Sequence, residues 1–310
     1  MKSIVTITIN PAIDKSTIVD HIVPNNKLRC SDTKVEPGGG GLNVSRVIKR
    51  LGGESLAIFP VGGHTGKLLQ ELLDKEGIKQ DPVEIKNWTR ENFMAVDSSS
   101  NQQFRFLMSG PETSIEEGQL LLDKLTNLAE KPDYIVASGS LPPGLPDNFF
   151  VKIAKIAQKM NSKFILDTSG KGLQMAALEK VYLLKPNLSE LSKMAGVESL
   201  KTEMIEEAAR QIIDKGNCEM LAVSLGPAGA LFVSKDYTEL IPAPPVHSKS
   251  TVGAGDSMLA GMVFSLAAGK SLQEVIRYGV ACGSATTMHS GTELCMKNDV
   301  DKLYKWIRKN

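Results

Sequence analysis

The chain has 310 residues, of which 42% are hydrophobic and 23% charged, and its formal net charge at pH 7 is +1. This is the composition of an ordinary soluble protein, and no long basic block points to nucleic acid as the main partner. No apolar run approaches the roughly 20 residues that a membrane-spanning helix needs, so we expect no membrane partner and a cytoplasmic protein.

Cysteine and histidine usage favours the same compartment. The four cysteines are widely separated, none forms a C-x-x-C pair, and the four histidines are scattered. A zinc site is therefore not indicated, and reduced, mainly structural thiols fit a cytosolic protein best. Residues 3–10 alternate as a strand does, which is unlike a signal peptide.

The first third of the chain is rich in expected strands. These lie at 3–10, 16–23, 28–36 and 54–61, with helices at 43–51 and 65–76. Three further β-type runs at 83–86, 92–98 and 103–108 lack helical crossovers, so we expect them to pair antiparallel. We place them with the two early strands in a small lid sheet, drawn from about 15–36 and 83–109.

From about residue 114, strands and helices alternate regularly. Strands are expected at 134–138, 163–167, 181–184, 220–224, 229–234 and 237–241, and helices at 115–130, 147–160, 188–195, 203–215, 256–268, 272–289 and 298–309. Such alternation predicts the α/β class, with a mostly parallel sheet covered by helices on both faces. No repeat, low-complexity tract or linker divides the chain.

The segment 251–257 (TVGAGDS) carries the strongest chemical signal. Gly253 and Gly255 lead into a helix, and a glycine-rich loop at a helix start leaves backbone N–H groups free to bind phosphate. Asp256 stands beside the positive end of that helix, which we expect to favour its ionised form. Such a carboxylate suits a general base acting on a hydroxyl that attacks a phosphoryl group. Taken alone, the same residues would favour a plain N-cap, and the rest of the chain reverses that preference.

Polar side chains follow five of the predicted strands. The carboxyl ends of parallel strands meet at one edge of a sheet, and ligands bind outside that edge. The residues concerned are Asn10, Pro11 and Asp14, then Ser138 to Gly144, Asp167, Lys185 to Asn187, and Ser224 to Pro227. One such loop would carry little weight, but five together mark one ligand-binding rim.

Asn187 and Glu190 are three residues apart at a predicted helix start, and so share a face of that helix. Both offer oxygen ligands, which suits Mg²⁺ held largely through water and nucleotide phosphates. An N-cap asparagine with a capping-box acid explains the pair fully, and the spacing alone favours that explanation.

The glycine run Gly38–Gly41 precedes Asn43 and an apolar helix. Four glycines allow the backbone to approach a ligand closely, and an asparagine there can bond sugar hydroxyls. The run is neither a Walker A loop, because no Lys-Ser/Thr follows, nor a dinucleotide fingerprint, because the G-x-G-x-x-G spacing is absent.

Four basic residues lie in or beside the proposed lid strands. They are Lys27, Arg29, Arg90 and Arg105. Each alone reads as a solvated surface charge, but four on one small sheet facing the rim favour a phosphate ester as ligand.

Together these residues resemble the phosphofructokinase B (ribokinase-like) family of carbohydrate kinases. The family's N-terminal signature is similar to GGGGLNVSRVIKRLGG at 38–53, its C-terminal signature to STVGAGDSMLAG at 250–261, its N-x-x-E segment to KPNLSEL at 185–191, and its nucleotide loop to SLGPAGA at 224–230. Its 6-phosphofructokinases are the members most similar to NPAID at 10–14, KLRC at 27–30, WTREN at 88–92 and SGSLPPG at 138–144.

The resemblance implies a single ribokinase-like domain over residues 1–310, with a β-sheet lid. It implies an ATP- and Mg²⁺-dependent enzyme that phosphorylates O1 of fructose 6-phosphate to give fructose 1,6-bisphosphate. Because family lids commonly pair between subunits, it also implies a homodimer.

The resemblance also gives individual residues a role. Asp256 would be the base, and Gly253, Ala254 and Gly255 would form the anion hole. The sugar phosphate would be held by Asp14, Gly39, Asn43, Arg90 and Ser140, with Lys27 on its phosphate, in its own or the partner's site. ATP would be bound by Lys185, Asn187, Ser224, Gly226 and Gly229, and Mg²⁺ by Asn187 and Glu190. Backbone oxygens of Ser250, Val252 and Thr286 are candidates for K⁺.

Alternatives remain open at this point. Relatives acting on tagatose 6-phosphate or fructose 1-phosphate usually have GGKG in the first signature, whereas Gly40 occupies the third position here. This favours fructose 6-phosphate. A catalytically dead sugar-phosphate sensor would be expected to lack Asp256 or the glycines before it, and both are present. A nicotinamide dehydrogenase is disfavoured by the missing dinucleotide fingerprint.

Overall fold

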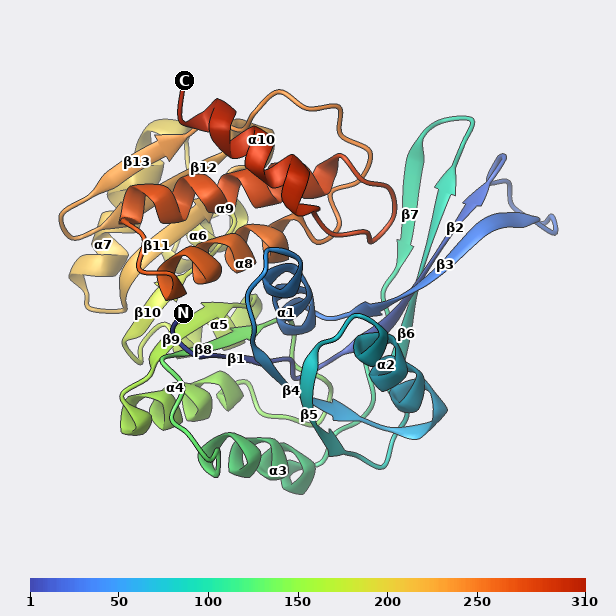
Figure 1. Ribbon diagram of the computed structural model, residues 1–310, viewed down its shortest axis with the longest axis horizontal. Helices are drawn as coiled ribbons and strands as arrows, with labels where there is room; N and C mark the ends of the chain where they lie inside the picture. Colours follow the sequence, from blue (N-terminus) through green and yellow to red (C-terminus); the bar gives the residue numbers. More distant parts are fainter.

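The computed structural model describes residues 1–310 as two β-sheets and ten α-helices (Figure 1). The larger sheet has nine strands in the order β13-β12-β11-β10-β9-β8-β1-β4-β5. Its strands are β1 Ile4–Ile7, β4 Leu56–Val61, β5 Lys79–Glu84, β8 Tyr134–Ser138, β9 Lys163–Asp167, β10 Val181–Leu184, β11 Cys218–Ser224, β12 Ala230–Ser234 and β13 Thr238–Ile241. All pairings are parallel except those of β12 and β13, so the expected α/β class is confirmed.

Helices cover both faces of this sheet, because its inner strands are apolar on both sides. In β8, Val136 faces the core shared with α1, α8, α9 and α10, while Ile135 and Ala137 face the core shared with α3 to α7. The helices are α1 Gly40–Arg50, α2 Gly63–Lys75, α3 Ile115–Thr126, α4 Phe149–Met160, α5 Gly170–Ala176, α6 Leu188–Met194, α7 Ile205–Asp214, α8 Ala254–Ala267, α9 Leu272–Thr287 and α10 Lys297–Ile307. No helix is long and apolar enough to cross a membrane.

The start of α8 depends on a glycine. Gly253 is the N-cap, with φ of 74°, in the left-handed region that side chains disfavour. A Cβ at Gly253 would also lie 2.6 Å from the Leu294 side chain. Behind this start, α8 buries Met258, Leu259 and Met262 against the sheet. The loop before α8 is therefore fixed by a buried helix on one side and by Leu294 on the other.

The smaller sheet has four strands in the order β3-β2-β6-β7 and projects from one side of the molecule (Figure 1). We refer to it as the lid. Its strands are β2 Ala12–Val19, β3 Cys30–Gly38, β6 Arg90–Asp97 and β7 Gln102–Phe106. One expectation about its strands is corrected: residues 83 and 84 end β5, at the edge of the large sheet, and do not belong to the lid. The expected antiparallel pairing of 92–98 with 103–108 is confirmed by β6 and β7. Strand β2 pairs with β6 in parallel.

Some element boundaries also differ from expectation. Helix α5 was not predicted, since its two glycines lower helix propensity, but burial of Leu173 and Ala176 compensates. Strand β2 begins at Ala12, so Asp14 lies within a lid strand instead of in a loop after β1. Helix α1 begins inside the glycine run, at Gly40.

The lid has two distinct faces. Residues opposite one another on paired strands share a face, which groups Phe93 with Phe106 and Phe104 with Ala95. Ile18 and Val96 oppose each other on the other face. Apolar side chains therefore lie on both faces of the lid, because successive side chains of a strand alternate.

Candidate active site

The loop before α8 and the first turn of that helix form the centre of the site. The Ser257 N–H donates to the Gly253 carbonyl, and the Ala254 N–H donates to Thr251 O at 3.3 Å. In helical geometry the N–H groups of Gly255 and Asp256 have no partner within α8. These two donors, together with the helix dipole, are suited to bind an anion, which is what the glycines predict.

Asp256 lies in the first turn of α8, and its side chain is held by Asn43 of α1. The Asn43 Nδ2 donates to Asp256 Oδ2 at 2.9 Å. Burial and the nearby Asp167 carboxylate raise the pKa of Asp256 to about 6, against the lowering effects of Asn43 and Lys185. The helix dipole was expected to favour the ionised form; desolvation acts against it and raises the pKa, yet a pKa of about 6 leaves the carboxylate mainly ionised at pH 7. A pKa near 6 suits a general base working near neutral pH.

Lys185 brings a buried positive charge to the same place. Its Nζ lies 3.0 Å from Asp167 Oδ2, at the carboxyl end of β9. Burial disfavours the ammonium, but Asp167 and Asp256 outweigh it and raise the pKa of Lys185. A Cβ placed on Gly255 would be 3.3 Å from this Nζ, so the ammonium lies beside the anion site. Asp167, which the sequence marked only as a strand-end residue, is what holds the ammonium there.

A second group of polar residues faces α8 from the root of the lid. Asn92 of β6 donates to Asp14 Oδ1 at 2.8 Å, and its own Oδ1 accepts from the Met108 N–H at 3.1 Å. Burial raises the pKa of Asp14, with Asn92 and Arg90 acting against it. Asp14 and Asn92 line a small cavity together with Val252 of the α8 loop and Arg105 of β7.

Arg90, Asn10 and Ser140 extend this group. Arg90 Nη2 donates to Asn10 O at 2.8 Å, and Asn10 Nδ2 reaches Ser140 Oγ at 3.2 Å. Burial lowers the pKa of Arg90, with Asp14 opposing it. The Arg90 Nε and Asn10 Oδ1 are buried and have no hydrogen-bond partner within the protein. Since buried polar atoms are rarely left unpaired, these two atoms point to a polar ligand.

The glycine run packs directly against the ends of β1 and β8. Gly39, the N-cap of α1, has φ of 113°. A Cβ on Gly40 would lie 2.2 Å from Ser138 Oγ, and one on Gly41 would lie 2.6 Å from Ile7 O. The glycines therefore allow α1 to begin at the rim of the sheet, which places Asn43 against Asp256.

A cavity of about 470 Å³ opens on the other side of the α8 loop. Its lining includes the predicted nucleotide residues Ser224, Gly226 and Gly229, and Thr251, Ala254 and Gly255 from the loop. Gly229 is fixed by close packing, because a Cβ there would lie 2.0 Å from Ile241 O. The lining is mostly apolar, as is usual for the part of a site that receives a planar base.

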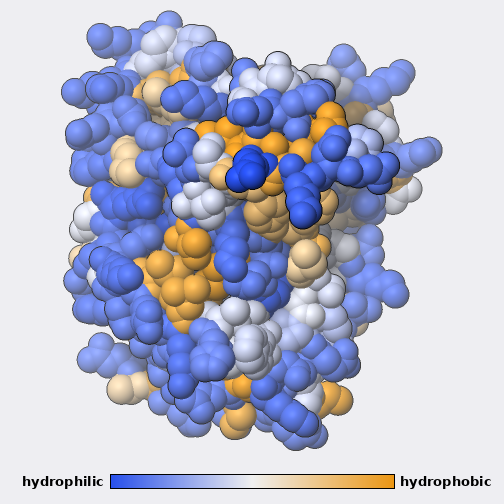
Figure 2. Space-filling view, turned by 90° about the vertical axis from the view of Figure 1, so that its right-hand side faces the viewer, coloured by the Kyte–Doolittle hydropathy of each residue, from blue (hydrophilic) through white to orange (hydrophobic).

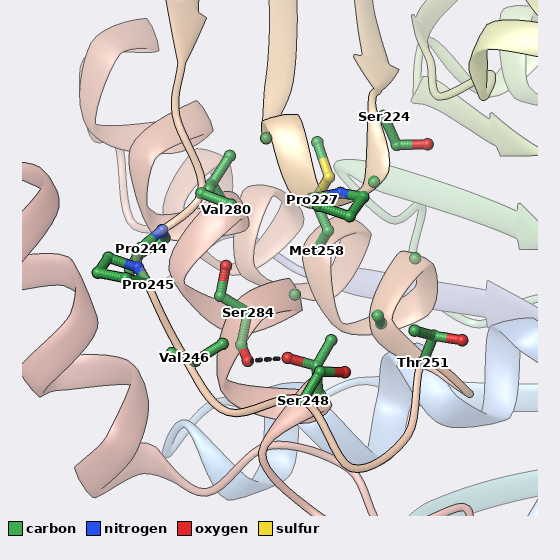
Figure 3. A pocket seen from close by; sticks show the side chains of 17 residues that line it. Ser224, Pro227, Pro244, Pro245, Val246, Ser248, Thr251, Met258, Val280 and Ser284 are labelled. Carbon is green, nitrogen blue, oxygen red and sulfur yellow. Dashed lines mark hydrogen bonds between the residues drawn. The ribbon is translucent and has the colours of Figure 1, made fainter. Parts of the chain in front are cut away.

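Sequence reasoning missed the far wall of this cavity. It consists of a strap after β13 and one side of α9, whose side chains gather around the cavity in Figure 3. The residues are Ala243, Pro244, Pro245 and Val246 from the strap, and Val280, Gly283, Ser284 and Thr287 from α9. The sequence signal for this wall was the uncharged, proline-containing run after residue 241. Prolines restrict the backbone and have no N–H group that needs a partner, so such a run can form an apolar wall.

Asn187 and Glu190 form a complete capping box at the start of α6. Asn187 Oδ1 accepts from the Glu190 N–H and Glu190 Oε2 accepts from the Asn187 N–H, each at 2.9 Å. Burial and Asp167 raise the pKa of Glu190, against the Asn187 N–H and Lys185. The capping box leaves Glu190 Oε1 available as an acceptor. No group of three or more acidic, histidine or cysteine side chains could hold a metal ion, so Mg²⁺ here would require water and phosphate ligands, which it commonly keeps.

The potassium candidates lie where the α8 loop meets α9. Ser250 and Thr286 are buried, and the Ser250 N–H donates to Thr287 O. The Thr286 carbonyl accepts from the His289 N–H at 3.1 Å. Carbonyl oxygens here and at Val252 are hard ligands of the kind a monovalent cation uses.

The basic lid residues are not all brought to the site. Lys27 and Arg29 lie exposed in the loop between β2 and β3, and this loop is at the end of the lid that points away from α8 (Figure 1). Arg105 instead reaches the α8 loop, donating to Thr251 Oγ1 at 3.1 Å. Gln103 of the same strand donates to Lys249 O at 2.9 Å. Strand β7 therefore connects the lid directly to the loop before α8.

Comparison with known proteins identifies the family. Residues 1–299 match the pfkB family of carbohydrate kinases. The chain is 42% identical over 308 residues to ATP-dependent 6-phosphofructokinase isozyme 2 of Escherichia coli K12, covering 99% of both chains. It is 39% identical over 302 residues to the isozyme 2 of Mycobacterium tuberculosis H37Rv, covering 97% of this chain and 89% of that protein. The crystal structure of phosphofructokinase-2 from Escherichia coli in complex with potassium matches with a TM-score of 0.95 and 41% identity, covering 99% of this chain and 100% of that one. The chain therefore belongs to the pfkB family of carbohydrate kinases.

Proposed function

We propose that this chain is an ATP-dependent 6-phosphofructokinase, which transfers the γ-phosphate of ATP to O1 of fructose 6-phosphate. The observation that carries the proposal is the position of the α8 loop between two cavities. Thr251, Ala254 and Gly255 line the large cavity, while Val252 lines the small one with Asp14. A phosphate entering from the large cavity would meet a hydroxyl in the small one at Asp256. The naming of the Escherichia coli and Mycobacterium tuberculosis relatives supports the same activity.

In this proposal Asp256 accepts the O1 proton as O1 bonds to the γ-phosphorus and the bond from that phosphorus to the ADP oxygen breaks. The N–H groups at the start of α8 and the Lys185 ammonium meet the charge on the transferring group. Asn187 and Glu190 would hold Mg²⁺, largely through water and phosphate, which neutralises phosphate charge when bound. Placement and charge stabilisation supply most of the catalysis in phosphoryl transfer.

Packing at Gly40 supports the choice of fructose 6-phosphate over the alternatives. A lysine at this position, as in the GGKG signature, would place its Cβ 2.2 Å from Ser138 Oγ and 2.9 Å from the Gly139 backbone. The backbone of β8 would have to move to accept it. Asp14, Gly39, Asn43, Arg90 and Ser140 are the residues that we assign to the sugar phosphate. The retained Asp256 and its glycines disfavour the inactive-sensor alternative.

We further propose one kinase domain that works as a homodimer paired through the lid. Phe93 and Phe106, adjacent on the outer lid face, are 37% and 51% exposed. Figure 2 shows this side of the molecule, with apolar areas surrounded by hydrophilic surface. Exposed aromatic pairs of this kind are typical of surfaces that a partner covers. Lys27 at the lid tip would then reach the sugar phosphate of the partner's site.

K⁺ bound by the carbonyl oxygens of Ser250, Val252 and Thr286 is a further part of the proposal. The family neighbour from Escherichia coli is described in complex with potassium. A cation at this place would fix the loop that leads into α8.

One coupled assay tests the substrate. ADP production is measured with fructose 6-phosphate, tagatose 6-phosphate and fructose 1-phosphate, each over a range of concentrations. The proposal predicts the highest kcat/KM for fructose 6-phosphate. A higher kcat/KM for either of the other two would assign the chain to that activity, and no ADP production above background with any of them would support the sensor.

A further inference from the structure

Arg46 of α1 is the largest fully buried side chain of the protein, with 1% exposure. Its Nε donates to both carboxylate oxygens of Glu76, at 3.0 and 2.9 Å, and its Nη2 donates to Glu76 Oε1 at 2.7 Å and to Glu36 Oε1 at 3.5 Å. Its Nη1 donates to Pro37 O at 2.8 Å and to Asn43 Oδ1 at 3.2 Å. All five N–H groups of the guanidinium are thus used. A fully bonded arginine at this depth cannot change its orientation without leaving buried groups unpaired.

The contact with Asn43 determines which end of that amide meets Asp256. An asparagine amide can be turned over, exchanging its carbonyl oxygen and its NH₂ group. Arginine has donors only, so the Asn43 oxygen must face Arg46. The NH₂ group is then the part directed at Asp256, and it donates to Oδ2 at 2.9 Å. Since α1 places Asn43 and Arg46 three residues apart, both lie on the same face of the helix.

We infer that Arg46 is a positioning residue for phosphoryl transfer, which holds the Asn43 amide so that a donor, and not an acceptor, faces the catalytic carboxylate of Asp256. This inference rests on the proposed function, in which Asp256 is the base. Arg46 contacts neither cavity. Its effect therefore passes through Asn43.

The charges around Asp256 make this donor important. Asp167 at the end of β9 and Asp14 of β2 raise the pKa of Asp256, and Lys185 after β10 and the Asn43 amide lower it, while burial raises it most. If the amide turned over, its oxygen would accept a hydrogen bond from the protonated carboxyl and would favour the inactive form. Losing Arg46 therefore raises the pH at which the base becomes ionised.

The test is the pH dependence of kcat/KM for fructose 6-phosphate in Arg46→Met. Methionine has a similar length but no donors. We expect the acid limb of the profile, near pH 6 in the wild type from the pKa of Asp256, to move up by about one unit, so that activity at acid pH falls by about tenfold. Arg46→Lys retains a charged donor and should recover part of the shift.

Glu76→Gln is the matched control. It weakens the same buried ion pair, but leaves Arg46 and its bond to Asn43 in place, so we expect loss of thermal stability without a moved acid limb. Should Arg46→Met fail to fold, the double variant Arg46→Met, Glu76→Met removes the arginine together with its closest carboxylate partner, a replacement that proteins often tolerate, and the same shift is expected there.

Two results would overturn the inference. The first is an acid limb that does not move in folded Arg46→Met or in the folded double variant. The second is a shift in Glu76→Gln as large as that in Arg46→Met. Failure of the proposed function has a different signature. In that case Asp256→Asn would keep its activity, whereas failure of the positioning role alone would leave Asp256→Asn inactive.

Discussion

Replacing Asp256 by asparagine should cost activity and increase stability at once. The variant keeps the shape of the side chain, and its oxygen can still accept from Asn43 Nδ2, which bonds Asp256 at 2.9 Å in the wild type. It cannot accept the O1 proton. We therefore expect kcat to fall by roughly 10²–10⁴-fold, the usual contribution of a general base, while ATP binding remains.

The stability effect follows from the raised pKa. The pKa of Asp256 rises from 3.8 to about 6 in the folded protein, chiefly through burial. The folded state therefore binds this proton more tightly than the unfolded state, and the wild type loses stability as pH increases from about 4 to about 6. Two units correspond to about 3 kcal/mol. Because the side chain is only partly buried, we expect about 1–2 kcal/mol after screening.

Thermal unfolding of both proteins between pH 4 and pH 8 measures this. At pH 4 the two Tm values should nearly coincide, because the wild-type carboxyl is then largely protonated and neutral like the amide. Above about pH 6.5 the asparagine variant should melt a few degrees higher. A variant that melts at or below the wild type at pH 8, or that keeps more than about half of kcat, would refute the assignment of Asp256 as a desolvated base.

Three further predictions concern the metal, the substrate phosphate and the dimer. Glu190→Gln should require more free Mg²⁺ for half-maximal rate at fixed MgATP, while its capping box persists; an unchanged Mg²⁺ curve would leave the residue a purely structural role. Lys27→Ala should lower kcat/KM for fructose 6-phosphate about ten- to hundredfold, mainly through KM, because a charged hydrogen bond to phosphate is lost. Lys34→Ala, also on the lid, should not lower it. Equal effects of the two substitutions would dismiss the role of Lys27. Phe106→Asp should convert the dimer to monomers, as measured by sedimentation. Leu178→Asp, at an exposed leucine outside the lid, should leave the sedimenting mass unchanged. If Phe106→Asp remained a dimer, pairing through this face would be ruled out.

The main sheet could be predicted from the sequence because its strands are short apolar runs that alternate with amphipathic helices. β8 and β9 were expected at 134–138 and 163–167, and the structure has the same bounds. The edge strand β5 was misplaced for an equally physical reason. Its sequence KQDPVE is polar and contains Pro82, which an edge strand tolerates but which gives no strand signal.

The residues of the candidate site could be predicted from the sequence, but the pKa shifts of their side chains could not. The motifs identified Asp256, Asn43 and Lys185, and the structure places them together. Nothing in their spacing shows that burial raises the pKa of Asp256, since desolvation depends on how α1 and α8 pack. The role inferred for Arg46 was also hidden, because in the sequence it is one more basic residue in an amphipathic helix.

The central claim is transfer of the ATP γ-phosphate to O1 of fructose 6-phosphate by Asp256. The most direct test is ³¹P NMR of wild type and Asp256→Asn incubated separately with Mg²⁺, ATP and fructose 6-phosphate at pH 7.5. The account predicts that the wild type forms ADP and fructose 1,6-bisphosphate in equal amounts, and that the variant forms both at least about a hundredfold more slowly. ADP with inorganic phosphate as the product, a phosphate on another hydroxyl, or comparable product from the variant would contradict it.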